Sequence, residues 1–278
     1  MKILVATPFM SQHFDAGMFW VKALCNMNHS VVLWDYRLHP ERLSSISNSN
    51  YELAIVFKGE GLDPRLLHTP RICYWPDDLG RTPGIEEVLR HYNKVFTPVR
   101  PTPDWMEWLP SGWDPSIHRD LKTERLVNTI YIGTANSDYK VKTITDISPT
   151  SVFGNRWVER GSSSNPPVYL RDLVGVSNQA KILIDVHQSP TVGLNRKMFE
   201  MMACGPTIVD RVPGVEEVLP GVWNLCSFNP EKVSEANLII SYFLSCPEAR
   251  DDLWKRQRKA IEPYTYENCA RRLLEWIK

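Results

Sequence analysis

Short runs of apolar residues alternate along the chain with stretches whose apolar positions recur at helical spacing. In the first 110 residues the apolar runs predict strands at 2–7, 30–35, 52–57, 71–75 and 94–98. Helical spacing is present at 17–28 and 85–92. Strands that are apolar on both faces are typical of parallel sheets covered by helices on each side. The alternation therefore predicts an α/β fold with a doubly wound sheet.

Turn-forming residues dominate segment 109–119, with the sequence LPSGWDPSIHR, and the alternation restarts after it. Further strands are expected at 128–133, 150–154, 181–186, 206–210 and 221–226, and helices at 168–180, 195–204 and 265–278. The break indicates a linker between two Rossmann-like domains. We expect an N-terminal domain over 1–112, a C-terminal domain over 113–262, and a terminal segment, 263–278, that can pack back on the N-terminal domain.

Length and charge narrow the class of protein. A chain of 278 residues that is 43% hydrophobic can bury the cores of two domains. Lys and Arg together number 32, and so do Asp and Glu. The chain therefore lacks the basic excess that is typical of proteins that coat nucleic acid or an anionic membrane. No stretch approaches the roughly 20 apolar residues that span a bilayer, and the N-terminal apolar run is too short for a signal peptide. The sequence predicts a cytoplasmic protein without a membrane span.

The strongest functional signal is segment 187–210, HQSPTVGLNRKMFEMMACGPTIVD. It predicts a strand end, a glycine-containing loop, a helix that begins near Gly193–Asn195, and another strand. A helix N-terminus presents free N–H groups and a positive dipole end, which suit a diphosphate. Arg196 adds a cation in the first turn. Glu200 lies on the same helical face and can accept hydrogen bonds from ribose hydroxyls. The alternative is that Arg196 and Glu200 form a surface ion pair on an ordinary helix.

The same segment carries a family resemblance. The run GLNRKMFEMMACGPTIVD, followed by RVPGVEEVLPG, resembles the C-terminal domain of group-1 glycosyltransferases. It is most similar to the subgroup typified by spore maturation protein CgeB, with its pattern N-x-R-x-F-E-x-x-A-x-G. The linker LPSGWDPSIHR, the strand segment NTIYIGTANSDYK and the C-terminal end resemble the same family, over residues 105–278. The resemblance implies a GT-B fold, in which two Rossmann-like domains face each other across a cleft and the C-terminal one holds a nucleotide-sugar donor.

The resemblance also implies roles for individual residues. Glu200 matches the glutamate that holds the donor ribose, and Gly133 matches the glycine after the first strand of the donor domain. Two positions depart from the common pattern: Val192 replaces a second glutamate, and Thr134 replaces an arginine. The donor-binding residues expected from the resemblance and the local pattern are Gly133, Thr134, Lys140, Asn155, Trp157, His187, Gly193, Leu194, Asn195, Arg196 and Glu200. Within this set, Trp157 is expected to stack on the donor's base.

Acidic residues and a histidine follow two strands of the N-terminal domain. His13 and Asp15 come after the first strand, and Asp77 and Asp78 come after the strand at 71–75. Because open α/β sheets bind ligands at the carboxyl ends of their strands, one of these residues is a candidate general base for the acceptor. The alternative is that Asp77 and Asp78 cap the next turn and that His13 is a solvated loop residue. His187 is either a donor contact or a structural histidine.

No Asp-x-Asp spacing occurs in the chain, so the sequence predicts neither a metal site nor a cofactor besides the donor. In a metal-independent transferase, a helix dipole and cationic side chains neutralise the departing diphosphate. A nicotinamide-dependent enzyme is disfavoured because the turn after the first strand lacks G-x-G-x-x-G. A sugar-nucleotide epimerase and a catalytically silent binding module remain as alternatives. The acceptor is open among a glycan, a protein, a small molecule and a modified base of DNA.

Overall fold

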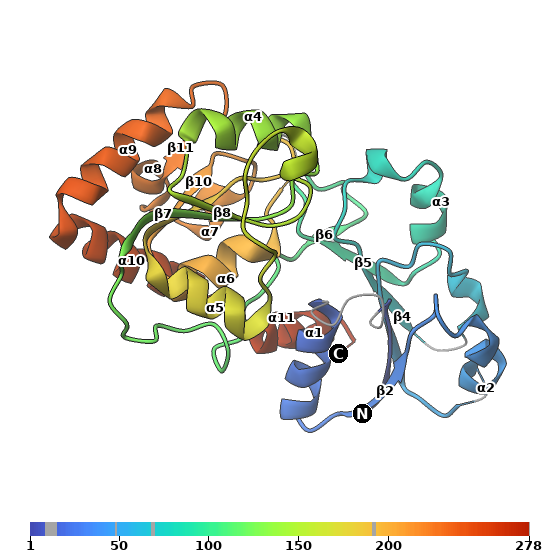
Figure 1. The fold of residues 1–278 in the computed structure, drawn as a ribbon. Coiled ribbons are helices and arrows are strands. Elements are labelled where there is room, and N and C mark those ends of the chain that lie inside the picture. Colours follow the sequence, from blue (N-terminus) through green and yellow to red (C-terminus); the bar gives the residue numbers. More distant parts are fainter. Residues whose placement is uncertain (9–15, 48, 68–69, 191–192, 278) are drawn as a thin grey trace. The chain divides into compact units, whose positions relative to one another are not determined.

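A computed structural model describes residues 1–8, 16–47, 49–67, 70–190 and 193–277. The chain divides into two compact units (Figure 1). Unit 1 comprises Met1–Pro110 and Tyr266–Lys278, and unit 2 comprises Ser111–Thr265. Each unit is built on its own parallel sheet, so the predicted α/β class with two Rossmann-like sheets is confirmed.

The sheet of unit 1 has six strands in the order β2-β1-β3-β4-β5-β6. Its elements are β1 (Lys2–Ala6), α1 (Ala16–Asn26), β2 (Ser30–Trp34), α2 (Leu43–Ser47), β3 (Leu53–Phe57), β4 (Arg71–Tyr74), α3 (Ile85–Leu89), β5 (Lys94–Thr97) and β6 (Glu107–Trp108). Every residue of β3 is buried, as its uninterrupted apolar run predicts. The sequence pattern missed β6, because two residues are too few to show a periodicity.

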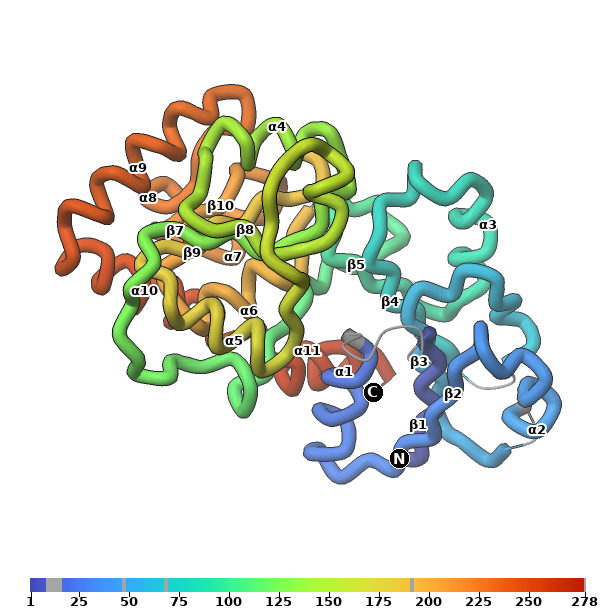
Figure 2. The backbone as a smooth tube through the Cα atoms, in the orientation of Figure 1, coloured from blue at the N-terminus to red at the C-terminus, as the bar shows by residue number. Residues whose placement is uncertain are grey.

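The last helix of the chain, α11 (Tyr266–Glu275), belongs to unit 1 and packs against α1 (Figure 2). The strand order explains why a second helix is needed there. From β2 onward, each connection leads to a strand nearer the β6 edge, whereas the connection from β1 to β2 runs the other way. Because the crossovers are right-handed, the later connections lie on one face of the sheet and α1 lies on the other. Trp20 of α1 and Tyr266 of α11 fill the other face, with ring centroids 5.8 Å apart.

The sheet of unit 2 has five strands in the order β11-β10-β9-β7-β8. Its elements are β7 (Val127–Ile132), α4 (Asp138–Ile147), β8 (Ser151–Phe153), α5 (Leu170–Gln179), β9 (Ala180–Asp185), α6 (Arg196–Cys204), β10 (Thr207–Asp210), α7 (Val215–Val218), α8 (Trp223–Cys226), β11 (Ser227–Phe228), α9 (Ser234–Ser245) and α10 (Pro247–Ile261). Helices α4 and α9 lie on one side of this sheet and α5 and α6 on the other (Figure 1).

One predicted strand is wrong. The run at 221–226 was expected to be extended, but residues Trp223–Cys226 form the short helix α8, and the strand is β11 directly after it. Val222 and Cys226 are buried, whereas Leu225 between them is 39% exposed. A spacing of four between buried positions suits one helical turn, and the apolar run was too short to reveal it.

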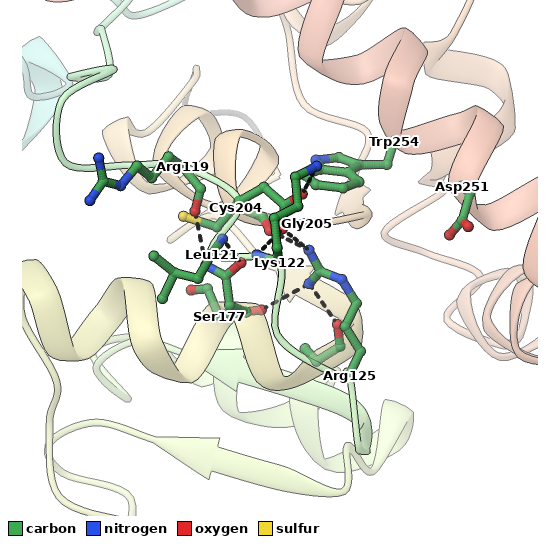
Figure 3. Close-up of polar contacts among 12 residues, drawn as sticks. Arg119, Leu121, Lys122, Arg125, Ser177, Cys204, Gly205, Asp251 and Trp254 are labelled. Atoms are coloured by element: carbon green, nitrogen blue, oxygen red, sulfur yellow. Dashed lines mark hydrogen bonds and ion pairs between the residues drawn. The ribbon is translucent and has the colours of Figure 1, made fainter.

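Arg125, in the segment before β7, holds the ends of two helices together (Figure 3). Its Nη1 donates to the carbonyls of Ser177 (3.4 Å) and Ala180 (3.0 Å) at the end of α5, and Nη2 donates to that of Cys204 (2.7 Å) at the end of α6. The guanidinium lies 4.8 Å from the ring centroid of Trp254. A cation at a helix C-terminus satisfies carbonyls that the helix leaves without partners.

Replacing Arg125 with Met should therefore lower the free energy of unfolding by about 3 kcal/mol, because it removes hydrogen bonds to carbonyls at the ends of two helices. Arg125→Lys should lose less, because an ammonium keeps the charge but lacks the planar fork that reaches both helices. Urea denaturation measures both. The exposed Lys122 provides the control Lys122→Met, and equal stability of the two Met variants would contradict the clamp.

Candidate functional site

The N-terminus of α6 is fixed to the end of β9 by a single side chain. Asn195 caps the helix: its Oδ1 accepts a hydrogen bond from the backbone N–H of Met198 at 3.0 Å. Its Nδ2 donates to Oδ2 of Asp185 at 2.9 Å. Because a carboxylate only accepts, these two bonds also define which amide atom is oxygen. The predicted helix start is thus present, and buried Asp185 holds it.

Lys197, in the first turn of α6, lies against the loop that begins at Gly133 directly after β7, here called the glycine loop. Its Nζ is 3.5 Å from Oδ1 of Asp185 and 5.1 Å from the ring centroid of Tyr131. A Cβ on Gly133 would come within 2.6 Å of this Nζ and 2.4 Å of the Tyr131 hydroxyl. Position 133 therefore has no room for a side chain, which gives the predicted glycine a physical reason.

Trp157 contacts the same loop from the protein interior, which corrects the expectation that it stacks on the donor's base. Its indole N–H donates to the carbonyl of Gly133 at 2.6 Å, and its ring packs edge-on against Tyr131. The side chain is 1% exposed, so it offers no open face on which a base could stack. Gly154 lies against the same carbonyl, because a Cβ there would come within 2.1 Å of it. The tryptophan shapes the glycine loop.

Arg196 and Glu200 form the ion pair that their spacing predicts, but it is not a surface pair. Nε of Arg196 lies 3.0 Å from Oε1 of Glu200, and the side chains are 30% and 3% exposed. The same oxygen lies 3.7 Å from Nε2 of His118, which is equally buried. A buried carboxylate needs such partners, because burial without them opposes its charge. Glu200 is therefore held by two groups, of which the sequence indicated one.

His187 belongs to a buried chain of polar groups behind the α6 N-terminus. Its Nδ1 lies 2.5 Å from Oδ1 of Asp210, and its backbone N–H donates to the same carboxylate at 3.1 Å. Asp210 also accepts a hydrogen bond from the hydroxyl of Tyr139 at 2.8 Å. Nε2 of His187 lies 4.0 Å from Oδ2 of Asp185. Burial alone lowers the pKa of His187, but Asp210 and Asp185 outweigh it and raise the pKa above its usual value.

The other candidates of the donor set lie in this unit as well. Lys140 is buried on α4 and donates to Oδ1 of Asn136 at 3.0 Å. Asn155 is exposed, and Gly193 and Leu194 are buried just before Asn195. The carbonyl of Thr134 accepts a hydrogen bond from the N–H of Asn136 at 2.9 Å.

The candidates for a general base lie in unit 1. Oδ2 of Asp77 lies 3.1 Å from Nζ of Lys58, and both side chains are about one third exposed. Asp78 accepts a hydrogen bond from the backbone N–H of Gly80, so it caps a turn as the alternative interpretation proposed. His13 and Asp15 lie outside the described residues.

The described residues contain no group of three or more His, Cys, Asp or Glu side chains placed to hold a metal ion. Within the same part of the chain, no helix combines the length and the apolar character that crossing a bilayer requires.

Comparison with known families gives this site its context. Residues 139–275 match a family described as "Glycosyl transferase-like". The matched segment includes α6 and both members of the Arg196–Glu200 pair, whereas the loop at Gly133 lies before it. No curated protein is significantly similar in sequence to the chain.

Solved structures of GT-B enzymes share the fold at low sequence identity. HepE of Anabaena, in complex with UDP and glucose, is 9% identical with a TM-score of 0.73, covering 100% of this chain and 99% of its own. Sucrose-phosphate synthase of Thermosynechococcus elongatus is 12% identical with a TM-score of 0.75, covering 100% and 98%. BGT of phage T4, in complex with its UDP-glucose substrate, is 11% identical with a TM-score of 0.67, covering 100% of both chains. The fold is therefore GT-B.

Sequence reasoning missed three parts of the site. The donor set predicted from the sequence contains Arg196 and not Lys197, although the arginine of N-x-R-x-F-E falls on position 197. Asp210 and Tyr139 were missed because their partner, His187, is distant in sequence. The sequence indicated His118 only as part of the linker segment. The pattern itself could have indicated Lys197; the other three depend on tertiary contacts.

The His187–Asp210 pair predicts an unusual titration. In nuclear magnetic resonance of ¹⁵N-labelled histidine, His187 should stay protonated above the ordinary value of about 6.5. Asp210→Asn should lower this pKa, because Asp185 is then the only carboxylate named here that opposes the effect of burial. Since the folded-state pKa is raised, the stabilisation is complete below the ordinary pKa and is lost as pH rises through the raised one. An unchanged titration in Asp210→Asn would contradict the pairing.

Proposed function

We propose that this protein transfers a sugar from a nucleotide-diphosphate sugar to a hydroxyl acceptor, and that unit 2 binds the donor. The observation that carries the proposal is the pairing of Lys197 with Gly133 at the N-terminus of α6. The ammonium lies against a backbone position that has no side chain, beside the N-terminus of a capped helix. A diphosphate requires such an arrangement of positive charge and open backbone.

The donor diphosphate is proposed to lie between the α6 N-terminus and the Gly133 loop. Lys197 supplies a point charge there, and Arg196, the preceding residue of the helix, supplies a planar guanidinium. The helix dipole adds a positive partial charge to both. With these groups the leaving diphosphate can be neutralised by protein alone, so we propose a metal-independent reaction.

The ribose is proposed to bind Glu200. This residue lies one helical turn beyond Arg196, about 6 Å along the axis at 1.5 Å per residue. That distance is close to the separation of a nucleotide's β-phosphate from its ribose. One face of α6 would then bind both parts of the donor. The ligands in the structures of HepE (UDP and glucose) and of the phage enzyme (UDP-glucose) support a uridine nucleotide and a hexose.

The acceptor's proton is proposed to go to Asp77. Asp78 is engaged in a turn, whereas Asp77 is partly exposed at the carboxyl end of β4, where open sheets bind ligands. The ion pair with Lys58 orients its carboxylate. A general base must be reachable by the acceptor, and a partly exposed aspartate meets this condition.

The activity is tested by incubating the protein with labelled UDP-glucose, without acceptor, in the presence of EDTA. A transferase should hydrolyse the donor slowly, because water replaces the acceptor, and chelation should not change the rate. An isomerised donor would indicate an epimerase, and binding without turnover a silent module. Loss of hydrolysis in EDTA that Mn²⁺ restores would contradict the metal-independent reaction.

The diphosphate site is tested by calorimetry with UDP. Lys197→Ala and Arg196→Ala should each weaken binding by about 1.5–3 kcal/mol, the usual contribution of a hydrogen bond to a charged group. Lys255→Ala, an exposed lysine on α10, is the control and should bind as the wild type does. If Arg196→Ala alone keeps full affinity, its guanidinium serves Glu200 and not the diphosphate.

A further inference from the structure

His118 has no role in the donor site described so far, yet it contacts that site's buried carboxylate. It lies in unit 2, in the turn that follows the boundary at Ser111, and is 1% exposed. Its Nε2 is 3.7 Å from Oε1 of Glu200. Both groups are charged or polar and withdrawn from water, so the contact requires a physical account.

The turn around His118 is rigid. The backbone N–H of His118 donates to the carbonyl of Asp114 at 2.8 Å, and the side chain of Asp114 accepts from the N–H of Ser116 at 2.8 Å. Trp113, just before this turn, donates its indole N–H to the carbonyl of Ile261 at 2.9 Å. The imidazole is therefore carried by a segment that is itself anchored to the end of α10.

The same turn determines which ring nitrogen carries the proton. The backbone N–H of Asp114 donates to Nδ1 of His118 at 3.1 Å. Nδ1 must then be the unprotonated nitrogen, which leaves the proton on Nε2, the atom that faces Glu200. Burial, the first cause, lowers the pKa of His118, and Arg196 lowers it further against the opposing effect of Glu200. A neutral imidazole thus directs an N–H dipole at the carboxylate.

His118 and Arg196 both approach the same oxygen of Glu200, Oε1. Both therefore contact the carboxylate that is proposed to bind the ribose. Arg196 comes from the helix of Glu200 itself and moves with it. His118 comes from a separate segment and so determines how the carboxylate lies relative to the rest of the unit.

We propose that His118 is a positioning residue for the donor ribose, acting through Glu200. The inference rests on the proposed function, because it requires that Glu200 bind a ribose. His118 does not touch the ligand; it orients the carboxylate before the ligand arrives, which removes an ordering cost from binding.

Two substitutions separate this role from a structural one. In His118→Gln, the side-chain amide N–H₂ reaches the place of Nε2 and keeps a polar N–H group beside Glu200, but the acceptor for the Asp114 N–H is lost. In His118→Asn, the side-chain oxygen stands where Nδ1 stood and keeps that acceptor, but the contact with Glu200 is lost. If His118 is a positioning residue, ribose recognition depends on its contact with Glu200. If its role is purely structural, only stability changes, and it depends on the acceptor for the Asp114 N–H.

The experiment is calorimetry with UDP and with 2′-deoxy-UDP, which lacks one ribose hydroxyl. The wild type should prefer UDP, and His118→Asn should reduce this preference roughly fivefold, the equivalent of about 1 kcal/mol. His118→Gln should retain most of the preference, even where its unfolding temperature is lower. His91→Asn, an exposed histidine of unit 1, is the control.

Each outcome decides a different question. If the wild type binds no nucleoside diphosphate, the proposed function fails. If the wild type prefers UDP and His118→Asn does so equally, the function stands and the role of His118 is overturned. Should His118→Asn not fold, the ¹⁵N signals of His118 in the wild type decide: they should report an Nε2–H tautomer that shifts with UDP, and an insensitive signal overturns the proposal.

Discussion

The hydrogen bond between Asn195 and Asp185 is the contact on which the candidate site depends. It joins the first residue before α6 to the last residue of β9, at the place where the chain leaves the sheet and enters the helix. Because Asn195 also caps α6, the same side chain fixes the position of the helix N-terminus and satisfies one of its N–H groups. Lys197, Arg196 and Glu200 all take their positions from that start.

Asp185 is fully buried, and its charge explains the polar groups around it. Lys197 approaches it from α6, and His187 approaches it from the strand end. His187 is in turn paired with buried Asp210. Carboxyl groups therefore alternate with basic groups from Asp210 to Lys197, which is the arrangement that offsets the desolvation of buried polar groups. The ammonium at the end of this series is the group that faces the glycine loop.

The segment that enters unit 2 controls the same helix from outside. Arg125 binds the carbonyl of Cys204 at its C-terminal end, and His118 contacts Glu200 in its middle. A helix whose start is capped, whose middle is contacted and whose end is clamped has few ways to shift. A site assembled on one helix face needs this rigidity, because a ligand that spans two of its side chains depends on their separation.

The sequence by itself determined most of the strands, the two parallel sheets and the start of α6, because apolar runs, turn formers and a capping residue are local signals. It also placed Arg196 and Glu200 on one face of α6, since helical spacing fixes which residues share a face. It did not determine which cation serves which partner. Arg196 and Lys197 are adjacent, but about 100° apart around the helix, so one meets Glu200 and the other meets Gly133. Nor did it show that Trp157 is buried or that His118 contacts Glu200. Those contacts join segments distant in the chain, and only tertiary packing brings them within reach of each other.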